Sequence, residues 1–252
     1  MVRIIICGIL GNMGSRLLEA CYADNDVEVV AGVDQRSGKL DNIPLFSSFN
    51  DCAVKADVVV DFSNPALTDD ILDYCARTKT ALVLCTTGQS EDQMSKIREL
   101  ARRVAVFKSA NMSLGVALLT SLVKKAAVLL GDSFDIEIIE KHHNKKVDAP
   151  SGTAFMLADA INSVRGSGYD YTYDRHEERR QRRKNEIGIH AVRGGTIVGE
   201  HEVLFAGNDE VITLSHAAAS KSLFATGAVK AAHFIVKQPA GLYNMDSMVQ
   251  GL

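Results

Sequence analysis

The chain has 252 residues, of which 46% are hydrophobic, 23% charged and 6% aromatic, values close to the average of folded soluble domains. This composition excludes a disordered, collagen-like or coiled-coil chain, and the length allows one large domain or two small ones. There are 28 Lys and Arg against 31 Asp and Glu, so the formal net charge is −3. That balance argues against nucleic acid or an anionic membrane as the main partner.

The cysteines predict neither a disulfide framework nor a thiolate zinc site, because they are odd in number, widely spaced and without a C-x-x-C pair. The five are Cys7, Cys21, Cys52, Cys75 and Cys85. The apolar opening is too short for a signal sequence, and we find no run that approaches the roughly 18–20 apolar residues of a membrane span. We therefore expect a cytoplasmic protein without a membrane partner.

Apolar, β-branched runs alternate with helical patterns through the first half of the chain. This alternation is typical of βαβ units and predicts a doubly wound parallel sheet with helices on both faces. Ser90 and Gln93 form an S-x-x-Q pattern that predicts a capped helix start. The predicted strands are Val2–Gly8, Glu28–Asp34, Asp57–Phe62, Ala81–Thr86 and Val104–Ser109.

The pattern changes from Ser113, where apolar residues with helical spacing predict one long helix. Strand-like runs then follow one another and predict an open sheet of mostly antiparallel or mixed character, so this part is of α+β type. A last helix is expected over about 222–236. The predicted strands here are Asp135–His142, Glu186–Arg193, Ile197–Ala206 and Val211–His216.

The segment Arg175–Lys184 holds six Arg or Lys and two Glu. It lacks interleaved aromatic side chains, and the chain as a whole is slightly acidic. We therefore interpret the segment as a solvated loop or helix face rather than as a nucleic-acid site.

Gly8, Gly11 and Gly14 lie between the first strand and a helical pattern, with the spacing G-x-x-G-x-x-G. Glycines at this place allow the backbone to approach a pyrophosphate that binds the amides of the helix N-terminus. A plain tight turn is the alternative, since the more common spacing is G-x-G-x-x-G. Asp34 ends the second strand, where a dinucleotide-binding fold places the acid that binds the adenosine ribose.

The cofactor preference stays open at this stage. Asp34 favours NADH by repelling a 2′-phosphate, whereas Arg36 and Lys39 just downstream are able to offset that charge and bind one. A solvated surface turn is an equally good interpretation of these two cations.

A second cluster of chemistry-bearing residues is the run Glu140–Ala154, EKHHNKKVDAPSGTA. Its P-S-G-T portion predicts a helix start whose amides near Gly152 and Thr153 point outward as anion donors. A His with an ordinary pKa near 6.5 and a Lys made more acidic by cationic neighbours are suited to supply protons at neutral pH. The basic side chains ahead of the helix start include His142, His143, Lys145 and Lys146. They suit a small carboxylate-rich substrate.

This run is open to two other interpretations. A metal site is disfavoured because no carboxylate or Cys cluster completes a ligand set and the lysines repel a cation, so no metal is expected. An ordinary surface loop is the stronger alternative. If one strand ran through both His142 and His143, their side chains would point to opposite faces of the sheet.

The chain resembles the dihydrodipicolinate (4-hydroxy-tetrahydrodipicolinate) reductase family over nearly its whole length. The H-H-x-x-K-x-D-A-P-S-G-T segment, residues 142–153, is the most specific feature, and weaker motifs occur in the family's order. These are the glycine turn at 8–14, Asp61-Phe62-Ser63, Thr86-Thr87-Gly88, Asn111–Val116, Ile187–Gly195 and Val198–His201.

The resemblance implies a Rossmann-like dinucleotide-binding domain, residues 1–112 and 223–252, and a substrate-binding and tetramerisation domain, residues 113–222. It implies a homotetramer that reduces a cyclic imine dicarboxylate of lysine and diaminopimelate biosynthesis with NADPH or NADH. By position, His142 matches the proposed acid/base, Lys146 the proposed proton donor and His143 a substrate contact. Gly152 and Thr153 match the amides that hold a substrate carboxylate, and we add Lys145 as a further substrate-binding cation.

The resemblance also assigns cofactor-binding segments, and the sequence departs from the family's pattern in several of them. Asn12 replaces the usual Arg or Lys, Gln35 a frequent Arg, Cys85 the usual Gly and Met112 a common aromatic residue. The implied cofactor-binding residues are Gly8, Ile9, Leu10, Gly11, Asn12, Met13, Asp34, Cys85, Thr86, Thr87, Ser109, Ala110, Asn111 and Met112.

Two alternatives of other classes remain at the level of sequence. One is a dehydrogenase that uses Cys85 as a nucleophile beside the nicotinamide, although no partner His motif surrounds this residue. The other is a non-catalytic NAD(P)-binding sensor on the same fold. A sensor has no need for the proton-donating set of His142, His143 and Lys146.

Overall fold

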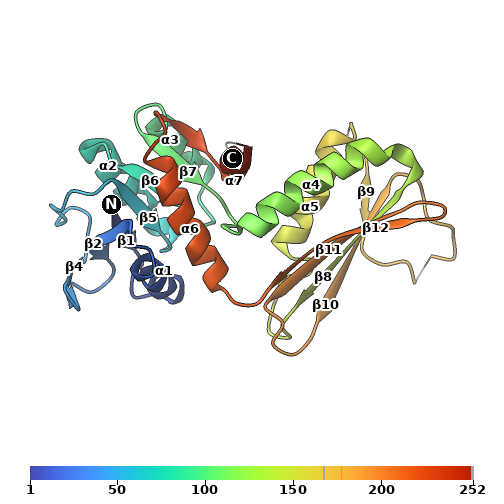
Figure 1. Ribbon diagram of the computed structural model, residues 1–252, viewed down its shortest axis with the longest axis horizontal. Helices are drawn as coiled ribbons and strands as arrows, with labels where there is room; N and C mark the ends of the chain where they lie inside the picture. The colour runs from blue at the N-terminus through green and yellow to red at the C-terminus, as the bar shows by residue number, and fades with distance from the viewer. Residues whose placement is uncertain (167, 177, 251–252) are drawn as a thin grey trace. The chain divides into compact units, whose positions relative to one another are not determined.

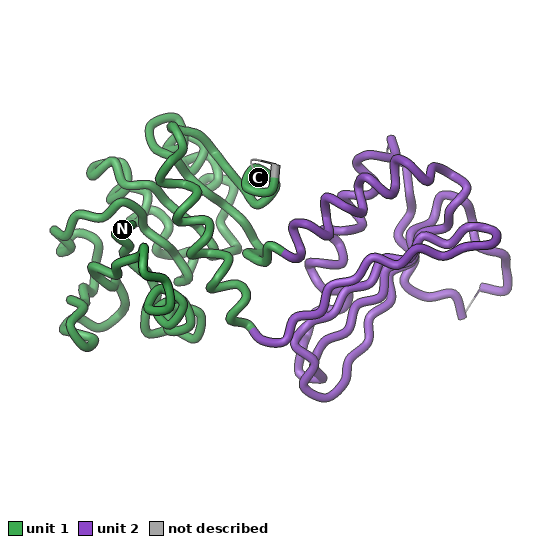
Figure 2. Tube along the Cα trace, in the orientation of Figure 1, with its two compact units in different colours: residues 1–114, 221–252 green, residues 115–220 purple. Residues whose placement is uncertain are grey.

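The computed structural model describes residues 1–166, 168–176 and 178–250 and divides into two compact units. Unit 1 comprises Met1–Leu114 with Lys221–Leu252, and unit 2 comprises Gly115–Ser220 (Figure 2). The chain therefore leaves unit 1 once and returns to complete it. Both crossing points lie within two residues of the boundaries expected from the sequence.

Unit 1 contains an eight-stranded sheet with the strand order β13-β7-β6-β5-β1-β2-β4-β3. All neighbours are parallel except the pair β3 and β4. The strands are β1 (Val2–Cys7), β2 (Val27–Val33), β3 (Gly38–Leu40), β4 (Ile43–Phe46), β5 (Val58–Asp61), β6 (Ala81–Leu84), β7 (Ala105–Lys108) and β13 (Gly241–Tyr243). The five predicted strands are present, with ends that differ by at most two residues from the predicted ones.

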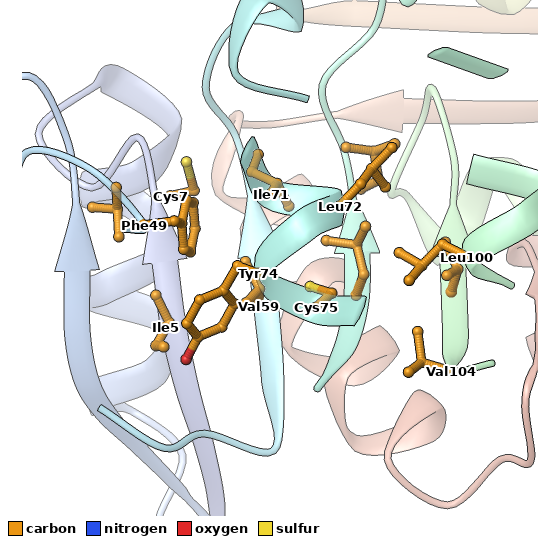
Figure 3. Packing of buried hydrophobic residues seen from close by; sticks show 14 of the residues in the cluster. Ile5, Cys7, Phe49, Val59, Ile71, Leu72, Tyr74, Cys75, Leu100 and Val104 are labelled. Carbon is orange, nitrogen blue, oxygen red and sulfur yellow. The ribbon is translucent and has the colours of Figure 1, made fainter. Parts of the chain in front are cut away.

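Helices cover both faces of this sheet, which confirms the doubly wound prediction. The apolar side chains of α2 and α3 pack with Ile5 and Val59 on one face (Figure 3), while α1 and α6 pack against each other and against the strands. The helices of unit 1 are α1 (Asn12–Tyr22), η1 (Pro65–Leu67), α2 (Thr68–Thr78), α3 (Glu91–Leu100), α6 (Ser222–Ile235) and α7 (Met245–Gln250). At the start of α3, Ser90 Oγ accepts from Gln93 N at 3.2 Å and Gln93 Oε1 accepts from Ser90 N at 3.1 Å, which confirms the predicted cap.

Unit 2 contains a mixed five-stranded sheet with the order β12-β11-β8-β10-β9 (Figure 1). β8, β10 and β9 are parallel, and β11 runs antiparallel to both β8 and β12. The strands are β8 (Asp135–His142), β9 (Asp170–Thr172), β10 (Glu186–Arg193), β11 (Gly199–Ala206) and β12 (Val211–Ala218). β8 and β10 have the predicted bounds, whereas β11 begins two residues later and β12 ends two residues later than predicted.

Two helices, α4 (Leu114–Leu130) and α5 (Gly152–Val164), cover one face of this sheet. Val123 of α4 and Leu157 of α5 meet Ile138 of β8 in one apolar core. Because side chains alternate along a strand, Glu140 and His142 of β8 lie on this same helix-covered face. The core thus fixes the side of the sheet on which these two residues lie.

The stretch Leu114–Ser133, which is α4 with the short turn η2 (Gly131–Ser133), is long and apolar enough by composition to cross a membrane. The expectation that no such run exists was therefore wrong. Leu119, Val123 and Ala127 of this helix pack in the core of unit 2. A core helix passes the same length and composition test as a membrane span, and we interpret α4 as a core helix.

The basic segment Arg175–Lys184 is a loop, as predicted, and most of its described residues are exposed. Among its described residues there is no helix or strand, but three of its arginines pair with carboxylates of the sheet. Arg175 and Arg182 bind Glu137 at 2.9 and 3.0 Å, and Arg180 binds Glu186 at 2.8 Å. These ion pairs connect the segment to β8 and β10.

Candidate functional site

The turn between β1 and α1 needs glycine at two of its positions. Gly8 has a φ of +79°, and a Cβ there would lie 2.6 Å from the carbonyl oxygen of Phe62. A Cβ at Gly14 would overlap the carbonyl oxygen of Gly8. Gly11 caps α1 and offers no side chain to its first amides. The helix N-terminus is therefore accessible to an anion, as a pyrophosphate site requires.

Asp34 follows β2 and is held against this turn. Its Oδ2 accepts a hydrogen bond from Leu10 N at 2.9 Å, and its Oδ1 accepts one from Gln35 N at 2.7 Å. A pocket of about 550 Å³ lies over the turn, and Arg36 lines it whereas Lys39 does not. The pocket is lined by Gly8, Leu10, Gly11, Asp34, Gln35, Arg36, Phe62, Ser63, Asn64 and Leu67.

Residues 62–64 line this pocket, although the sequence motif around them received no binding role. Ser63 is fixed by Asp61, a fully buried carboxylate at the end of β5, which accepts from both the amide and the hydroxyl of Ser63. Ser63 N also lies 3.0 Å from Thr86 Oγ1. The signal that would have identified Ser63 is the D-F-S turn directly after a buried strand, at the edge where parallel α/β sheets bind ligands.

The two further segments expected to bind the cofactor follow β6 and β7, so they lie at the same carboxyl edge of the sheet. Ser109 Oγ donates to Asn111 O at 2.7 Å, and Asn111 Oδ1 accepts from Ser113 N at 2.9 Å. A Cβ at Gly227 of α6 would overlap Met112 O, so the last of these residues packs closely against the returning helix. This edge fits a dinucleotide: a glycine turn, an uncapped helix start and an anchored acid occur together.

Cys85 does not fit the role of a nucleophile. Its side chain is buried, and burial, with the charge of Asp61 as a lesser cause, raises the pKa of its thiol well above the ordinary value. A thiol held in the protonated form is a poor nucleophile. The structure therefore argues against the dehydrogenase alternative that relied on this residue.

Glu140 lies at the centre of the second cluster, in unit 2. Its side chain is fully buried on the helix-covered face of β8. His142 Nδ1 lies 2.6 Å from Glu140 Oε2, and Ser151 N donates to Oε1 at 3.0 Å. Arg193 of β10 donates to both carboxylate oxygens at 2.7 and 2.8 Å. Burial acts to raise the pKa of Glu140, but the bonds from Arg193 and His142 outweigh it and lower the pKa below the usual value.

Lys146 and Lys145 lie in the loop that joins β8 to α5. Lys146 Nζ donates to Asp148 Oδ1 at 2.7 Å, and this bond lowers the pKa of the Asp148 carboxyl. Lys145 is exposed. His143 Nδ1 is buried and has no hydrogen-bond partner among the described residues. An unsatisfied polar atom in a cationic loop is what a site for a polar ligand would show.

Gly152 and Thr153 begin α5, as predicted. Ser151 is the cap of this helix, and its Oγ accepts from Ala154 N at 3.3 Å. Nothing lies within 4 Å of the place where a Cβ of Gly152 would stand. The helix start therefore faces open space beside the cationic loop, an arrangement that suits a carboxylate.

His201 belongs to the same cluster and was assigned no role from sequence. Its Nε2 lies 2.9 Å from Ser151 Oγ, and its ring meets that of His142 edge to face, with centroids 5.2 Å apart. Burial, and secondarily the neighbouring His142, lowers its pKa to about 4. His201 is therefore neutral at pH 7. The register of β11 on β8, which places His201 opposite Glu140, would have identified it.

The comparisons with known proteins agree over the whole chain. Residues 2–112 match the model of the N-terminal domain of dihydrodipicolinate reductase, and residues 115–249 match that of its C-terminal domain. A 4-hydroxy-tetrahydrodipicolinate reductase of Caldanaerobacter subterraneus subsp. tengcongensis is 49% identical over 250 residues, covering 99% of both chains. That of Clostridium tetani is 48% identical and covers 99% of this chain and 97% of its own.

A solved structure agrees with these sequence matches. The dipicolinate-bound dihydrodipicolinate reductase from Paenisporosarcina sp. TG-14 has a TM-score of 0.83 and 25% identity, covering 97% of each chain.

Proposed function

Because the chain belongs to the dihydrodipicolinate reductase family, we propose that it reduces 4-hydroxy-tetrahydrodipicolinate, or its dehydrated form dihydrodipicolinate, to tetrahydrodipicolinate with NADPH or NADH. The reaction belongs to lysine and diaminopimelate biosynthesis, and the enzyme is an oxidoreductase. The observation that carries the proposal is the cluster in unit 2, where a buried glutamate joins His142 to the start of α5 beside Lys146. This cluster combines proton donors with a carboxylate site.

The bound nicotinamide supplies a hydride, and binding, orientation and proton delivery are left to the protein. The amides at the start of α1, which the glycine turn leaves accessible, hold the pyrophosphate, and Asp34 holds the adenosine ribose. The loops at 85–87 and 109–112 complete the cofactor site. Residues 1–112 and 223–252 therefore form the dinucleotide-binding domain, and residues 113–222 bind the substrate.

The substrate is held by its two carboxylates. The amides of Gly152 and Thr153 at the start of α5 bind one of them, His143 contacts the substrate, and the charge of Lys145 attracts the dianion. As the conjugated ring carbon is reduced, an electron pair moves to the ring nitrogen, which then accepts a proton. Lys146 or His142 donates this proton: one N–H bond of the donor breaks, and an N–H bond of the product forms.

The assembly we propose is a homotetramer formed through unit 2, in the cytoplasm, without nucleic acid or membrane as a partner. No described helix of unit 2 covers the face of its sheet opposite α4 and α5, where Ile139 and Leu204 lie among charged side chains. A partly apolar sheet face is suited to bury itself against another copy. Sedimentation equilibrium of the purified protein tests this assembly, and a monomer at micromolar concentration would contradict it.

A non-catalytic sensor on the same fold would bind the nucleotide without turning over the substrate. No observation favours it, since the proton-donating residues and the substrate-binding helix start are all present.

The direct test follows absorbance at 340 nm with purified protein and the freshly generated product of the preceding synthase, with NADPH and NADH compared at equal concentration. We expect an enzyme-dependent loss of absorbance, and the two rates rank the cofactors. A folded, nucleotide-binding protein that consumes neither cofactor would refute the reductase and leave the sensor.

A further inference from the structure

Glu140 connects two halves of the substrate site that are separate in the chain. Glu140 Oε2 lies 2.6 Å from His142 Nδ1, and Glu140 Oε1 accepts a hydrogen bond from the amide of Ser151, the cap of α5, at 3.0 Å. Arg193 binds both oxygens and also donates to Asp148 O at 2.6 Å. The buried carboxylate thus holds the imidazole and the helix start, and its partner Arg193 holds the loop that carries Lys146.

The contacts of Glu140 determine which nitrogen of His142 carries the proton when the ring is neutral. A carboxylate paired with a guanidinium has no proton to donate, so the short contact with His142 requires Nδ1 to be the donor. The neutral ring then has its lone pair on Nε2, and the charged ring presents an N–H there.

The Nε2 side of the ring lies against a glycine of β11. A Cβ at Gly199 of β11 would lie 3.0 Å from His142 Nε2, a distance shorter than an ordinary contact. His201, which is in β11 like Gly199, packs its ring edge to face against that of His142. Together these contacts fix the plane of the imidazole and leave Nε2 as the ring nitrogen that exchanges a proton with the substrate.

We propose that Glu140 is a positioning residue: it holds His142 in the Nδ1–H form, directs Nε2 to the substrate, and ties this orientation to the carboxylate-binding start of α5. The proposal rests on the reductase function. In the proton-transfer step, the Nε2–H bond of the imidazolium breaks and the ring-nitrogen N–H bond of the product forms. His142 ends neutral and keeps its Nδ1–H bond to Glu140.

The test uses Glu140→Gln, which keeps the size of the side chain and removes its charge. We expect kcat to fall about 10²-fold or more, while KM for the dicarboxylate changes much less. Side-chain nitrogen NMR, with the His142 signals identified by their loss in His142→Asn, should show the neutral Nδ1–H form in the wild type and a mixture in Glu140→Gln. Unchanged kcat and an unchanged tautomer in this variant would overturn the proposal.

Glu137→Gln is the matched control. Glu137 belongs to the same strand and, like Glu140, pairs with a histidine and with arginine: His190 at 2.7 Å, and both Arg175 and Arg182. It points to the other face of the sheet, so its variant should leave the His142 tautomer and kcat as in the wild type. An equal loss in both variants would show that general charge loss, rather than positioning, is responsible.

Gly199→Ala and the wild-type spectrum keep the proposal testable if Glu140→Gln does not fold. Gly199→Ala crowds Nε2 and leaves Glu140 in place, so kcat should fall with the Nδ1–H form retained. A wild-type kcat in this variant, or an Nε2–H ring in the wild type, would overturn the proposal. If the wild type consumes no NADPH or NADH, the reductase function fails, whereas the tautomer of the wild type and of Glu140→Gln still decides the role of Glu140.

Discussion

Lys146 and His142, the two proposed proton donors, lie in different surroundings. The ammonium group of Lys146 is paired with the exposed Asp148, whereas the imidazole of His142 is paired with the buried Glu140. The ion pair of Lys146 is therefore the more exposed of the two, and that of His142 the more buried.

Replacement of either donor by alanine should lower kcat by roughly 10²-fold if that residue transfers the proton. Lys125→Ala is the matched control, because Lys125 lies exposed on α4, away from the cluster. Steady-state rates at 340 nm measure the effect. Unchanged turnover in Lys146→Ala or in His142→Ala would remove that residue from the donor role.

Asp34 offers a second prediction at this scale. Its carboxylate is held by the amides of Leu10 and Gln35, so it is fixed at the end of β2. Asp34→Ala should weaken the binding of NADH more than that of NADPH, because the carboxylate is expected to bind ribose hydroxyls but to repel a 2′-phosphate. Calorimetric Kd values for both cofactors measure this, and equal weakening would show that Asp34 does not discriminate at the ribose.

At the scale of elements, the strands and the start of α3 were predictable because their signals are local. The helix α2 was not predicted, although Asp69 and Asp70 in its first turn and its apolar residues Ile71 and Cys75 are sufficient signals. The pair β3 and β4 has only three and four residues, and pairing with β2 rather than local pattern forms it. Such short strands depend on tertiary contacts that a single sequence does not specify.

The β1–α1 turn carries the prediction for this scale. Gly14→Ala would place a Cβ against the carbonyl oxygen of Gly8, and backbone is unable to move aside as a side chain would. We expect a loss of about 3 kcal/mol in the free energy of unfolding, the upper end for overpacking, and weaker nucleotide binding. Urea unfolding measures it, with Gly194→Ala, where the Cβ meets open space, as the control. Wild-type stability in Gly14→Ala would contradict this account of the turn.

At the scale of the whole molecule, the substrate cluster depends on strands far apart in sequence. Glu140, Arg193 and His201 come from β8, β10 and β11. Strand register brings them together, with Arg193 beside His142 and His201 beside Glu140. Residues His142–Thr153, from the end of β8 to the start of α5, were identifiable because they are contiguous. To identify Arg193 and His201 as members of the cluster, the pairing of β10 and β11 with β8 must be known, and the sequence pattern alone does not provide it.

His201 predicts how stability depends on pH. Its folded pKa of about 4 lies below the ordinary value of about 6.5, so the unfolded chain takes up a proton first as the pH falls. Stability should therefore decrease from about pH 6.5 down to about pH 4, by up to about 3 kcal/mol from this group. Lowered carboxylate pKa values such as that of Glu140 add a loss at the acidic end of this range.

Urea unfolding at pH 7.0, 5.5 and 4.5 tests this dependence. His201→Gln should flatten the decrease between the first two values, while His176→Gln, which changes an exposed histidine, should keep the wild-type slope. A slope unchanged in His201→Gln would show that another group titrates in this range.

The return of the chain to unit 1 has a consequence for its biosynthesis. β13 pairs with β7, and α6 packs on α1 and the central strands, yet both elements are translated after unit 2. While the ribosome is still producing unit 2, the nascent sheet of unit 1 has an unpaired edge at β7 and an apolar face without its helix. Unit 2, whose elements are contiguous, is free to fold first, and unit 1 is completed only when α6 and β13 have left the ribosome.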